Sequence, residues 1–342
     1  MKILFDSAST VMQNAAGGVG VRMRKTLKRL ADIAEVKFFD KWEDKIADFD
    51  ILHIFKVSTE VISEIKHAKK HGVKVVVSSV IDPNNNFKLT FNKLVAMLLR
   101  QQNSFGVIKK SLQLADAIMC QTEKERRFVI KMYKTEPHKV FVVPSAMDDV
   151  RADASPEYFR KSTGIEGKFI IQVGRFDRNK NQLSVIRAVK GTDMQLVLVG
   201  GPDKSDASYF EQCKAEAGEN VHFLGWIDHN DPLLCSAYAA AHSFIIPSYH
   251  EIFGNTLFES GMYGCNLVST NALPIDDWGI TDYCLTVNPN SIDDIRNKLR
   301  ASLEKARTGE IAEIIKWDYS WESVLNKYMT VYKYVLDDEG VK

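Results

Sequence analysis

The sequence predicts an α/β protein made of two Rossmann-like domains, each with a doubly wound parallel sheet. Short apolar runs alternate with longer segments of helical periodicity along nearly the whole chain. The runs are continuously apolar, which is typical of strands buried on both faces of a parallel sheet. The scheme occurs twice, with six apolar runs in each half, and 342 residues are enough for two domains of ordinary size.

The first domain is expected over residues 1–150. Segments with apolar residues at helical spacing, such as GVRMRKTLKRLADI and EVISEIKHAKKHG, separate its apolar runs. Right-handed crossovers through such helices give a doubly wound layer. The six strands are expected at KILFD (2–6), EVKFF (35–39), DILHIF (50–55), VKVVVSS (73–79), DAIMCQ (116–121) and KVFVVP (139–144).

The second domain is expected over residues 151–317, after a boundary in the polar stretch around residues 145–155. A third segment, residues 318–342, contains SWESVLNKYMTVYKYVL (320–336), whose apolar spacing predicts one amphipathic helix. The six strands of the second domain are expected at KFIIQVG (168–174), MQLVLVGG (194–201), NVHFLG (220–225), HSFIIPS (242–248), NLVSTN (266–271) and CLTVN (284–288).

The charges nearly cancel, with 45 Lys and Arg residues against 44 Asp and Glu residues. A dedicated nucleic-acid binder would normally carry a strong basic excess, so nucleic acid is not an expected partner. The odd number of scattered cysteines indicates reduced thiols and hence a cytoplasmic protein. These cysteines are Cys120, Cys213, Cys235, Cys265 and Cys284.

Any membrane contact is expected to be peripheral. The start MKILFDS is too short and too quickly polar for a signal peptide. No apolar run approaches the roughly 20 residues that a membrane-spanning helix needs. The segment KLVAMLLRQQ (93–102), Lys109 and Lys110, and the basic stretch 66–74 could lie on the inner membrane face. Solvated lysines and a helix with one buried face are the simpler interpretation.

The stretch HEIFGNTLFESGMYG (250–264) follows the apolar run HSFIIPS. Ligands of open parallel sheets bind beyond the carboxyl ends of the strands. The amides of Asn255, Thr256 and Leu257 are expected to be free at the start of the next helix, where they would favour a phosphate. Gly254 would let the ligand approach the backbone.

Two carboxylates flank this helix start, Glu251 before it and Glu259 about one turn inside it. Carboxylates bind phosphate poorly but accept hydrogen bonds well from sugar hydroxyls. Each glutamate alone is more simply a solvated charge. Beside a phosphate site, the two together predict a sugar nucleotide.

A second segment, VGRFDRNKNQ (173–182), also follows an apolar run and carries Arg175 and Lys180. Past Gly174 its only apolar residue is Phe176, so it is expected to contribute little to the core. Two cations beyond a strand end could neutralise a diphosphate leaving group. The glycine-rich segment AAGGVGVRMRKTL (15–27) could cradle a phosphate or be a plain turn, and the sequence does not decide between them.

This constellation resembles glycosyltransferase family 4, the retaining enzymes of GT-B fold, and the resemblance spans nearly the whole chain. Glu251 and Glu259 match the E-x₇-E motif of the family, and VGRFDRNKNQ matches its Arg/Lys motif. GGVG, ADAIMCQTEKE and YSWESVLNKYMTVY resemble its glycine loop, the last unit of its N-terminal domain and its terminal helix. The resemblance implies a GT-B fold, in which two Rossmann-like domains face each other across a cleft, and a terminal helix that crosses back to the N-terminal domain.

The resemblance also implies roles for individual residues. Arg175 and Lys180 would stabilise the departing nucleoside diphosphate, while Glu259 would hold the ribose and Glu251 the donor sugar. Gly18 and Val19 would close over the phosphate from the opposite domain. Trp226 and Ile227 would lie near the base, and His250 either lines the cleft or is a plain surface residue. The backbone would contact sugar and phosphate at Phe253, Gly254, Asn255, Thr256 and Leu257.

One departure from the family concerns the acceptor side. Many members carry a histidine at the end of the fourth strand of the N-terminal domain, whereas VKVVVSSVIDPNNN has none. Asp82 or Ser79 could replace it, and Asp82 is the candidate we name. His53, in the run DILHIF, is the nearest alternative, although a histidine at a strand end is more often a satisfied structural group.

The resulting expectation is a retaining, metal-independent transferase of hexose-type sugars. Its donor would be a UDP-sugar or GDP-sugar and its acceptor a glycan or lipid-linked glycan, in surface polysaccharide assembly. No cofactor or metal is expected, because no cluster of His, Cys or carboxylates has metal-ligand spacing. A catalytically silent sugar-nucleotide-binding subunit, an epimerase or a phosphorylase on the same fold remain alternatives, since a fold does not fix its chemistry.

Two other enzyme classes fit the sequence less well. A nicotinamide-dependent oxidoreductase would need G-x-G-x-x-G at the end of the first strand, but GGVGVR lacks that pattern and ten residues, 7–16, separate it from the strand. A metal-dependent single-domain transferase would need its DxD motif after a strand. Here DFD (48–50) precedes the run ILHIF and is more simply a turn.

Overall fold

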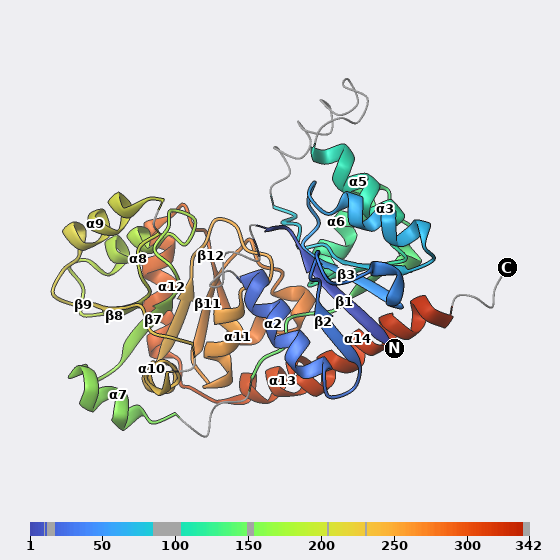
Figure 1. The fold of residues 1–342 in the computed structure, drawn as a ribbon. Coiled ribbons are helices and arrows are strands. Elements are labelled where there is room, and N and C mark those ends of the chain that lie inside the picture. The colour runs from blue at the N-terminus through green and yellow to red at the C-terminus, as the bar shows by residue number, and fades with distance from the viewer. Residues whose placement is uncertain are drawn as a thin grey trace. The chain divides into compact units, whose positions relative to one another are not determined.

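A computed structural model describes residues 1–9, 11, 18–84, 104–148, 154–203, 205–229 and 231–337. The chain divides into two compact units, which we call unit 1 (Met1–Ser145 with Trp321–Lys342) and unit 2 (Ala146–Ser320). Each unit is a six-stranded parallel sheet with helices on both faces (Figure 1). The segment 93–102 and the first residues of the glycine-rich segment, 15–17, lie outside the described residues.

The strands of unit 1 follow the order β2-β1-β3-β4-β5-β6 across the sheet. They are β1 (Lys2–Ser7), β2 (Glu35–Phe38), β3 (Ile51–Phe55), β4 (Lys74–Ser78), β5 (Ala117–Cys120) and β6 (Val140–Val142). The main helices of this unit are α2 (Gly18–Leu30), α3 (Ile62–Lys70), α5 (Ser104–Leu114), α6 (Glu123–Tyr133) and the C-terminal α14 (Trp321–Asp337).

Both faces of this sheet are buried. Leu52 and Val75 belong to a core cluster that includes residues of α3, α5 and α6. On the other face, His53 of β3 is fully buried against two tyrosines of α14. Its Nδ1 lies 2.7 Å from the hydroxyl of Tyr332, and its Nε2 lies 3.0 Å from Oγ of Ser78. Both ring nitrogens are therefore satisfied, and His53 is a structural group.

The buried imidazole makes the stability of unit 1 depend on pH. Burial, and to a smaller extent the positive charge of Arg22, lowers the pKa of His53 well below its usual value. The folded chain then keeps the ring neutral, whereas the unfolded chain protonates it below about pH 6.5. Its contribution to stability is complete above that pH and declines as the pH falls, by up to about 1.4 kcal/mol per pH unit.

Chemical unfolding of the wild type and His53→Gln across this pH range measures the effect. We expect the stability advantage of the wild type to shrink as the pH falls, because the glutamine does not titrate. An advantage that stays constant with pH would contradict the buried neutral state of His53.

The strands of unit 2 follow the order β12-β11-β10-β7-β8-β9. They are β7 (Phe169–Val173), β8 (Gln195–Val199), β9 (Val221–Gly225), β10 (Ser243–Ile246), β11 (Asn266–Thr270) and β12 (Cys284–Val287). The helices of this unit are α7 (Pro156–Thr163), α8 (Gln182–Val189), α9 (Ala207–Glu216), α10 (Pro232–Ala240), α11 (Asn255–Met262), α12 (Ile292–Glu304) and α13 (Glu310–Tyr319).

Consecutive residues of the central strands enter different cores. Phe169 and Ile171 of β7 pack in a cluster that includes residues of α7, α10, α11 and α13. Ile170, between them, packs in a second cluster with residues of α8, α9 and α12. This burial on both faces explains the continuously apolar runs of the sequence.

The predicted fold class is confirmed. A strand forms at each of the twelve apolar runs, and both sheets are parallel and doubly wound. The helix expected at residues 320–336 is α14. In unit 2, β7 connects onward to β8 on one side, while its other neighbour, β10, connects to β11 on the opposite side. The connections therefore diverge between β7 and β10, which is where open sheets of this type bind ligands.

Candidate functional site

Two loops leave the sheet of unit 2 at the point where its connections diverge. We call residues 174–181, after β7, the β7 loop, and residues 247–254, after β10, the β10 loop. The β7 loop carries Arg175 and Lys180, and the β10 loop carries Glu251. Because β7 and β10 are neighbours in the sheet, residues about 70 positions apart come together at one edge.

The centre of the site is an ion pair between Lys180 and Glu251, in which Nζ of the lysine contacts Oε1 of the glutamate. That carboxylate oxygen also accepts a hydrogen bond of 3.0 Å from Oγ of Ser248. The side chains are 28% and 12% exposed, so the pair is largely shielded from water but still reachable. A cation and an acceptor of hydrogen bonds therefore lie side by side at this edge of the sheet.

Arg175 lies at the rim of the site, with 53% of its side chain exposed. Its guanidinium group pairs with Asp177 at 3.1 Å and with Asp203 at 3.0 Å. Hydrogen bonds from Ser205, and also the charge of Arg175, lower the pKa of Asp203. Nothing in the sequence points to Asp203, because it follows β8, whose loop shows no motif.

Two glutamine side chains hydrogen-bond to the backbone of the β7 loop. Nε2 of Gln182 donates to the carbonyl of Arg175 at 2.9 Å, and Nε2 of Gln172 donates to the carbonyl of Lys180 at 2.8 Å. Phe176 is fully buried, with its ring against Phe210. The expectation that this segment contributes little to the core is wrong, because one aromatic ring anchors the loop while its charged residues stay at the surface.

The helix after the β10 loop is α11, with Gly254 as its N-cap at φ 70°. Amides of a first helical turn have no acceptor within the helix, which leaves those of Asn255 and Thr256 suited to an anion. The amide of Leu257 is not free as expected, because the turn closes early and it donates to the carbonyl of Gly254 at 2.9 Å. Oδ1 of Asn255 is buried without a hydrogen-bond partner in the described part of the chain.

The side chains of Phe253 and Leu257 are buried in the core of unit 2. Only their backbone groups remain to contact a ligand, which is the form of contact that the resemblance implies.

Glu259 lies inside α11 and is oriented by a tyrosine that the sequence analysis missed. The hydroxyl of Tyr238 donates to Oε2 of Glu259 at 3.2 Å, and Nδ1 of His229 lies 3.9 Å from Oε1. Burial, and then the charge of Glu259, raises the pKa of Tyr238 well above its usual value, so the hydroxyl stays a donor. Trp226, 61% exposed, follows β9, and Ile227 packs partly against the core.

Three of the predicted site residues, Gly18, Val19 and Asp82, lie in unit 1. Gly18 and Val19 are the first two residues of α2, and a Cβ added at Gly18 would meet nothing within 4 Å among the residues that the structure describes. Asp82 follows β4, and its Oδ1 accepts a hydrogen bond of 2.8 Å from the amide of Asn84. Oγ of Ser79 donates to the buried carboxylate of Glu125 at 2.7 Å, which gives Ser79 a structural role.

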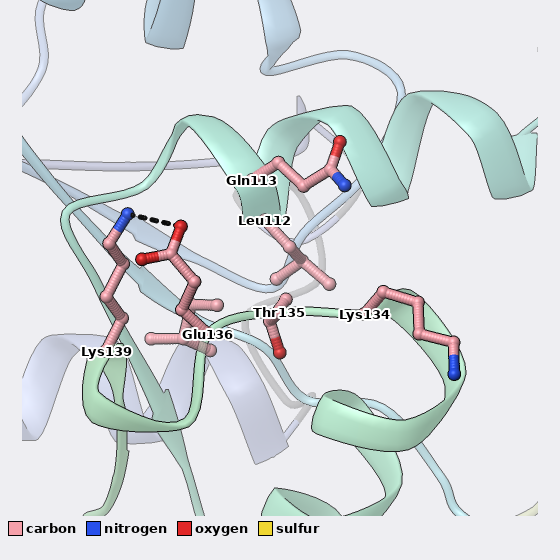
Figure 2. Close-up of a pocket in the computed structure, with 7 residues that line it drawn as sticks. Leu112, Gln113, Lys134, Thr135, Glu136 and Lys139 are labelled. Carbon is pink, nitrogen blue, oxygen red and sulfur yellow. Dashed lines mark hydrogen bonds and ion pairs between the residues drawn. The ribbon is translucent and has the colours of Figure 1, made fainter.

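A cavity of about 170 Å³ lies elsewhere in unit 1, at the C-terminal ends of α5 and α6. None of the predicted site residues lines it. Across its rim, Nζ of Lys139 donates to Glu136 at 3.2 Å (Figure 2). Its lining consists of Leu112, Gln113, Ile118, Lys134, Thr135, Glu136 and Lys139.

Two features are absent from the residues that the structure describes. These residues contain no group of three or more His, Cys, Asp or Glu side chains able to hold a metal ion. They also contain no helix with the length and apolar character needed to cross a membrane.

Comparison with known proteins connects this site to a family. Residues 155–314 match the family model of glycosyl transferases group 1. The matched segment includes Arg175, Lys180, Glu251 and Glu259.

Two curated relatives indicate the range of similarity. The chain is 22% identical over 242 residues to O-antigen chain mannosyltransferase B of Escherichia coli, over 66% of this chain and 62% of that protein. It is 27% identical over 195 residues to N-acetylgalactosamine-N,N'-diacetylbacillosaminyl-diphospho-undecaprenol 4-alpha-N-acetylgalactosaminyltransferase of Campylobacter jejuni, over 56% and 48%. The chain thus spans less than two thirds of the length of these relatives.

Solved structures share the fold over nearly the whole chain. Sucrose-phosphate synthase from Thermosynechococcus elongatus has a TM-score of 0.78 at 17% identity, covering 99% of this chain and 100% of that one. The Anabaena protein Alr3699/HepE in complex with UDP has a TM-score of 0.74 at 15% identity, covering 98% and 100%. Residues 155–314, just under half of the chain, therefore carry the match to the glycosyl transferases group 1, and the chain has the two-domain fold of GT-B type.

Proposed function

We propose that this protein is a glycosyltransferase that moves a sugar from a nucleoside-diphosphate sugar to a glycan or lipid-linked acceptor. The observation that carries the proposal is the Lys180–Glu251 pair beside the start of α11, within the segment that matches the family. A lysine and the free amides of a helix start suit the diphosphate. A carboxylate at the same point suits the hydroxyls of the donor sugar.

The proposed roles of these residues follow from where negative charge develops during the reaction. When the bond between sugar and diphosphate breaks, negative charge develops on the leaving phosphate. Lys180 and Arg175 would neutralise that charge, and the amides of Asn255 and Thr256 would add hydrogen bonds. Oδ1 of Asn255, buried without a partner in the described part of the chain, would accept a hydrogen bond from the ligand.

The other end of the donor is proposed to bind across α11. Glu259, held by Tyr238, would accept hydrogen bonds from the ribose hydroxyls. The exposed ring of Trp226 offers a surface on which the base could stack. Asp82 in unit 1 is proposed to bind the acceptor, and Gly18 and Val19 are proposed to contact the phosphate.

The finer features of the reaction extend this proposal. We propose a hexose-type sugar, a UDP or GDP donor, retention of configuration and no required metal, as in family 4, to which this chain is proposed to belong. Retention implies attack from the face of the leaving group, with the departing phosphate taking the acceptor proton. The names of the relatives, one for an O-antigen chain and one for a diphospho-undecaprenol sugar, support surface polysaccharide or glycolipid assembly.

A panel of UDP-, GDP-, ADP- and CMP-sugars tests the donor site by thermal shift. A donor at 100 times its dissociation constant should stabilise the protein by about 2.7 kcal/mol, which is readily detected. Glu259→Ala should lose this stabilisation because the ribose hydroxyls lose the carboxylate that accepts their hydrogen bonds. Glu211→Ala is a matched control, since Glu211 is exposed on α9 and pairs only with Lys214 among the described contacts.

Three outcomes are informative. Stabilisation by one base class, lost in Glu259→Ala and kept in Glu211→Ala, would support the donor site and identify the base. Binding without release of nucleoside diphosphate on addition of acceptors would favour a silent binding subunit. No stabilisation by any of these sugars would contradict the proposal.

Cytoplasmic location and a peripheral contact with the inner membrane face stay predictions. Exposed Lys66 and Lys70 of α3 and Lys110 of α5 would make this contact, because α3 and α5 pack against each other. Failure to cosediment with anionic lipid vesicles at low salt would contradict the membrane contact.

A further inference from the structure

We propose that Asn179 is a positioning residue that holds Lys180 and Glu251 in register for the diphosphate end of the donor. The inference rests on the proposed function and concerns a residue that touches neither sugar nor phosphate in that proposal. It starts from the way the two loops of the site are joined.

The side chain of Asn179 binds both backbone groups of His250. Its Oδ1 accepts from the amide of His250 at 2.8 Å, and its Nδ2 donates to the carbonyl of His250 at 3.0 Å. The carbonyl of Asn179 also accepts from the amide of Tyr249 at 2.9 Å. Three hydrogen bonds therefore join the β7 loop to the β10 loop through this one residue.

On each loop, these hydrogen bonds lie close to the residue that forms the ion pair. Asn179 directly precedes Lys180, and His250 directly precedes Glu251. A fixed Asn179–His250 contact thus sets the relative position of the next residue on each loop. A slip of one residue between the loops would separate the lysine from the glutamate.

The sheet does not supply this alignment. The pairing between β7 and β10 joins Ser243 with Ile170 and Phe244 with Ile171, before either strand ends. Beyond the strands, Asn181 adds one longer contact, from Nδ2 to the carbonyl of Pro247 at 3.3 Å. The bidentate contact of Asn179 is therefore the main link between the loops next to the ion pair.

The chemistry of the contact restricts the side chain. It requires a donor and an acceptor on one short side chain, which a primary amide supplies. Leucine is nearly isosteric with asparagine and can form neither bond, so Asn179→Leu removes the contact while filling the same space. Asn179→Ala removes it without adding bulk.

The two ends of the donor make the inference testable without an acceptor. A nucleoside monophosphate would use Glu259 and Trp226, whereas only a diphosphate or its sugar would reach Lys180. Loss of the loop register should therefore weaken diphosphates selectively. A general loss of structure would weaken both ligands alike.

Isothermal titration calorimetry with UDP, UMP, GDP, GMP, ADP and AMP measures this selectivity. For Asn179→Leu and Asn179→Ala we expect the affinity for the diphosphate of the preferred base to fall by about tenfold, from two lost hydrogen bonds. We expect the affinity for its monophosphate to change by less than about threefold. Arg178→Gln is the matched control, because Arg178 lies in the same loop but pairs outward with Asp206 at 2.7 Å.

The outcomes separate this inference from the function on which it rests. Unchanged diphosphate affinity in both variants, or equal losses for diphosphate and monophosphate, would overturn the role of Asn179 alone. Wild-type protein that binds none of the diphosphates would overturn the proposed function and this inference with it.

Discussion

Replacing Lys180 by alanine is expected to slow sugar transfer by at least about a hundredfold, the usual effect of removing one group that stabilises a developing anion. The lysine meets the leaving diphosphate in a largely shielded site, where bulk water cannot replace its charge. The β7 loop should persist, because Phe176 and the bonds from Gln172 and Gln182 hold its backbone without the lysine side chain. Release of nucleoside diphosphate from the donor identified in the binding panel measures the rate.

Replacing Arg175, in the same loop, should also slow sugar transfer strongly. Arg175→Ala removes a second cation, which in the free protein is shared with Asp177 and Asp203. Lys214→Ala is the control, since this exposed lysine on α9 carries the same charge outside the site. Full activity in both Lys180→Ala and Arg175→Ala would exclude the proposed role in leaving-group stabilisation.

The fold could be predicted from the sequence because a strand buried on both sheet faces appears there as a continuously apolar run. A strand such as β7, with Ile170 and Ile171 in different cores, must be apolar at every position. The order of strands across the sheet leaves no such pattern in the sequence. It depends on which helix crosses which face, and this order brings Lys180 beside Glu251.

The site could be predicted in part for the same reason. Charged residues directly after apolar runs, such as Arg175 and Glu251, are visible in the sequence. Their partners are not visible in the sequence, because nothing in the local pattern around each of them shows which distant residue it meets. Asp203 lies after β8, Tyr238 lies on α10, and Asn179 resembles any loop asparagine until its bonds to His250 are seen.

The expectation for Phe176 failed for a related reason. One apolar residue among charged neighbours predicts little burial by composition. The neighbouring loop after β8 runs parallel to it, through a bridge to Pro202, and rings from α9 and β9 close over the side chain. Burial of a loop residue depends on such distant elements, which local composition does not describe.

Substitution of Gly200 by alanine is expected to destabilise unit 2 by about 3–5 kcal/mol, combining backbone strain with overpacking. Gly200 directly follows β8 and has φ 148°, a conformation that L side chains rarely adopt. An added Cβ would lie 2.0 Å from the carbonyl oxygen of Gly174, a contact with backbone that no rotamer relieves. Chemical unfolding followed by circular dichroism measures the loss.

Gly191→Ala separates the two causes of this loss. Gly191 also has a positive φ, of 71°, but no described residue lies within 4 Å of its added Cβ. The free energy of unfolding of Gly191→Ala should fall only by the cost of this backbone conformation, about 1–2 kcal/mol. Equal losses in the two variants would show that strain alone matters and that the β7 and β8 ends have room to separate. A much larger loss in Gly200→Ala would mean that this close approach fixes Gly174, and with it the position of Arg175 at the edge of the site.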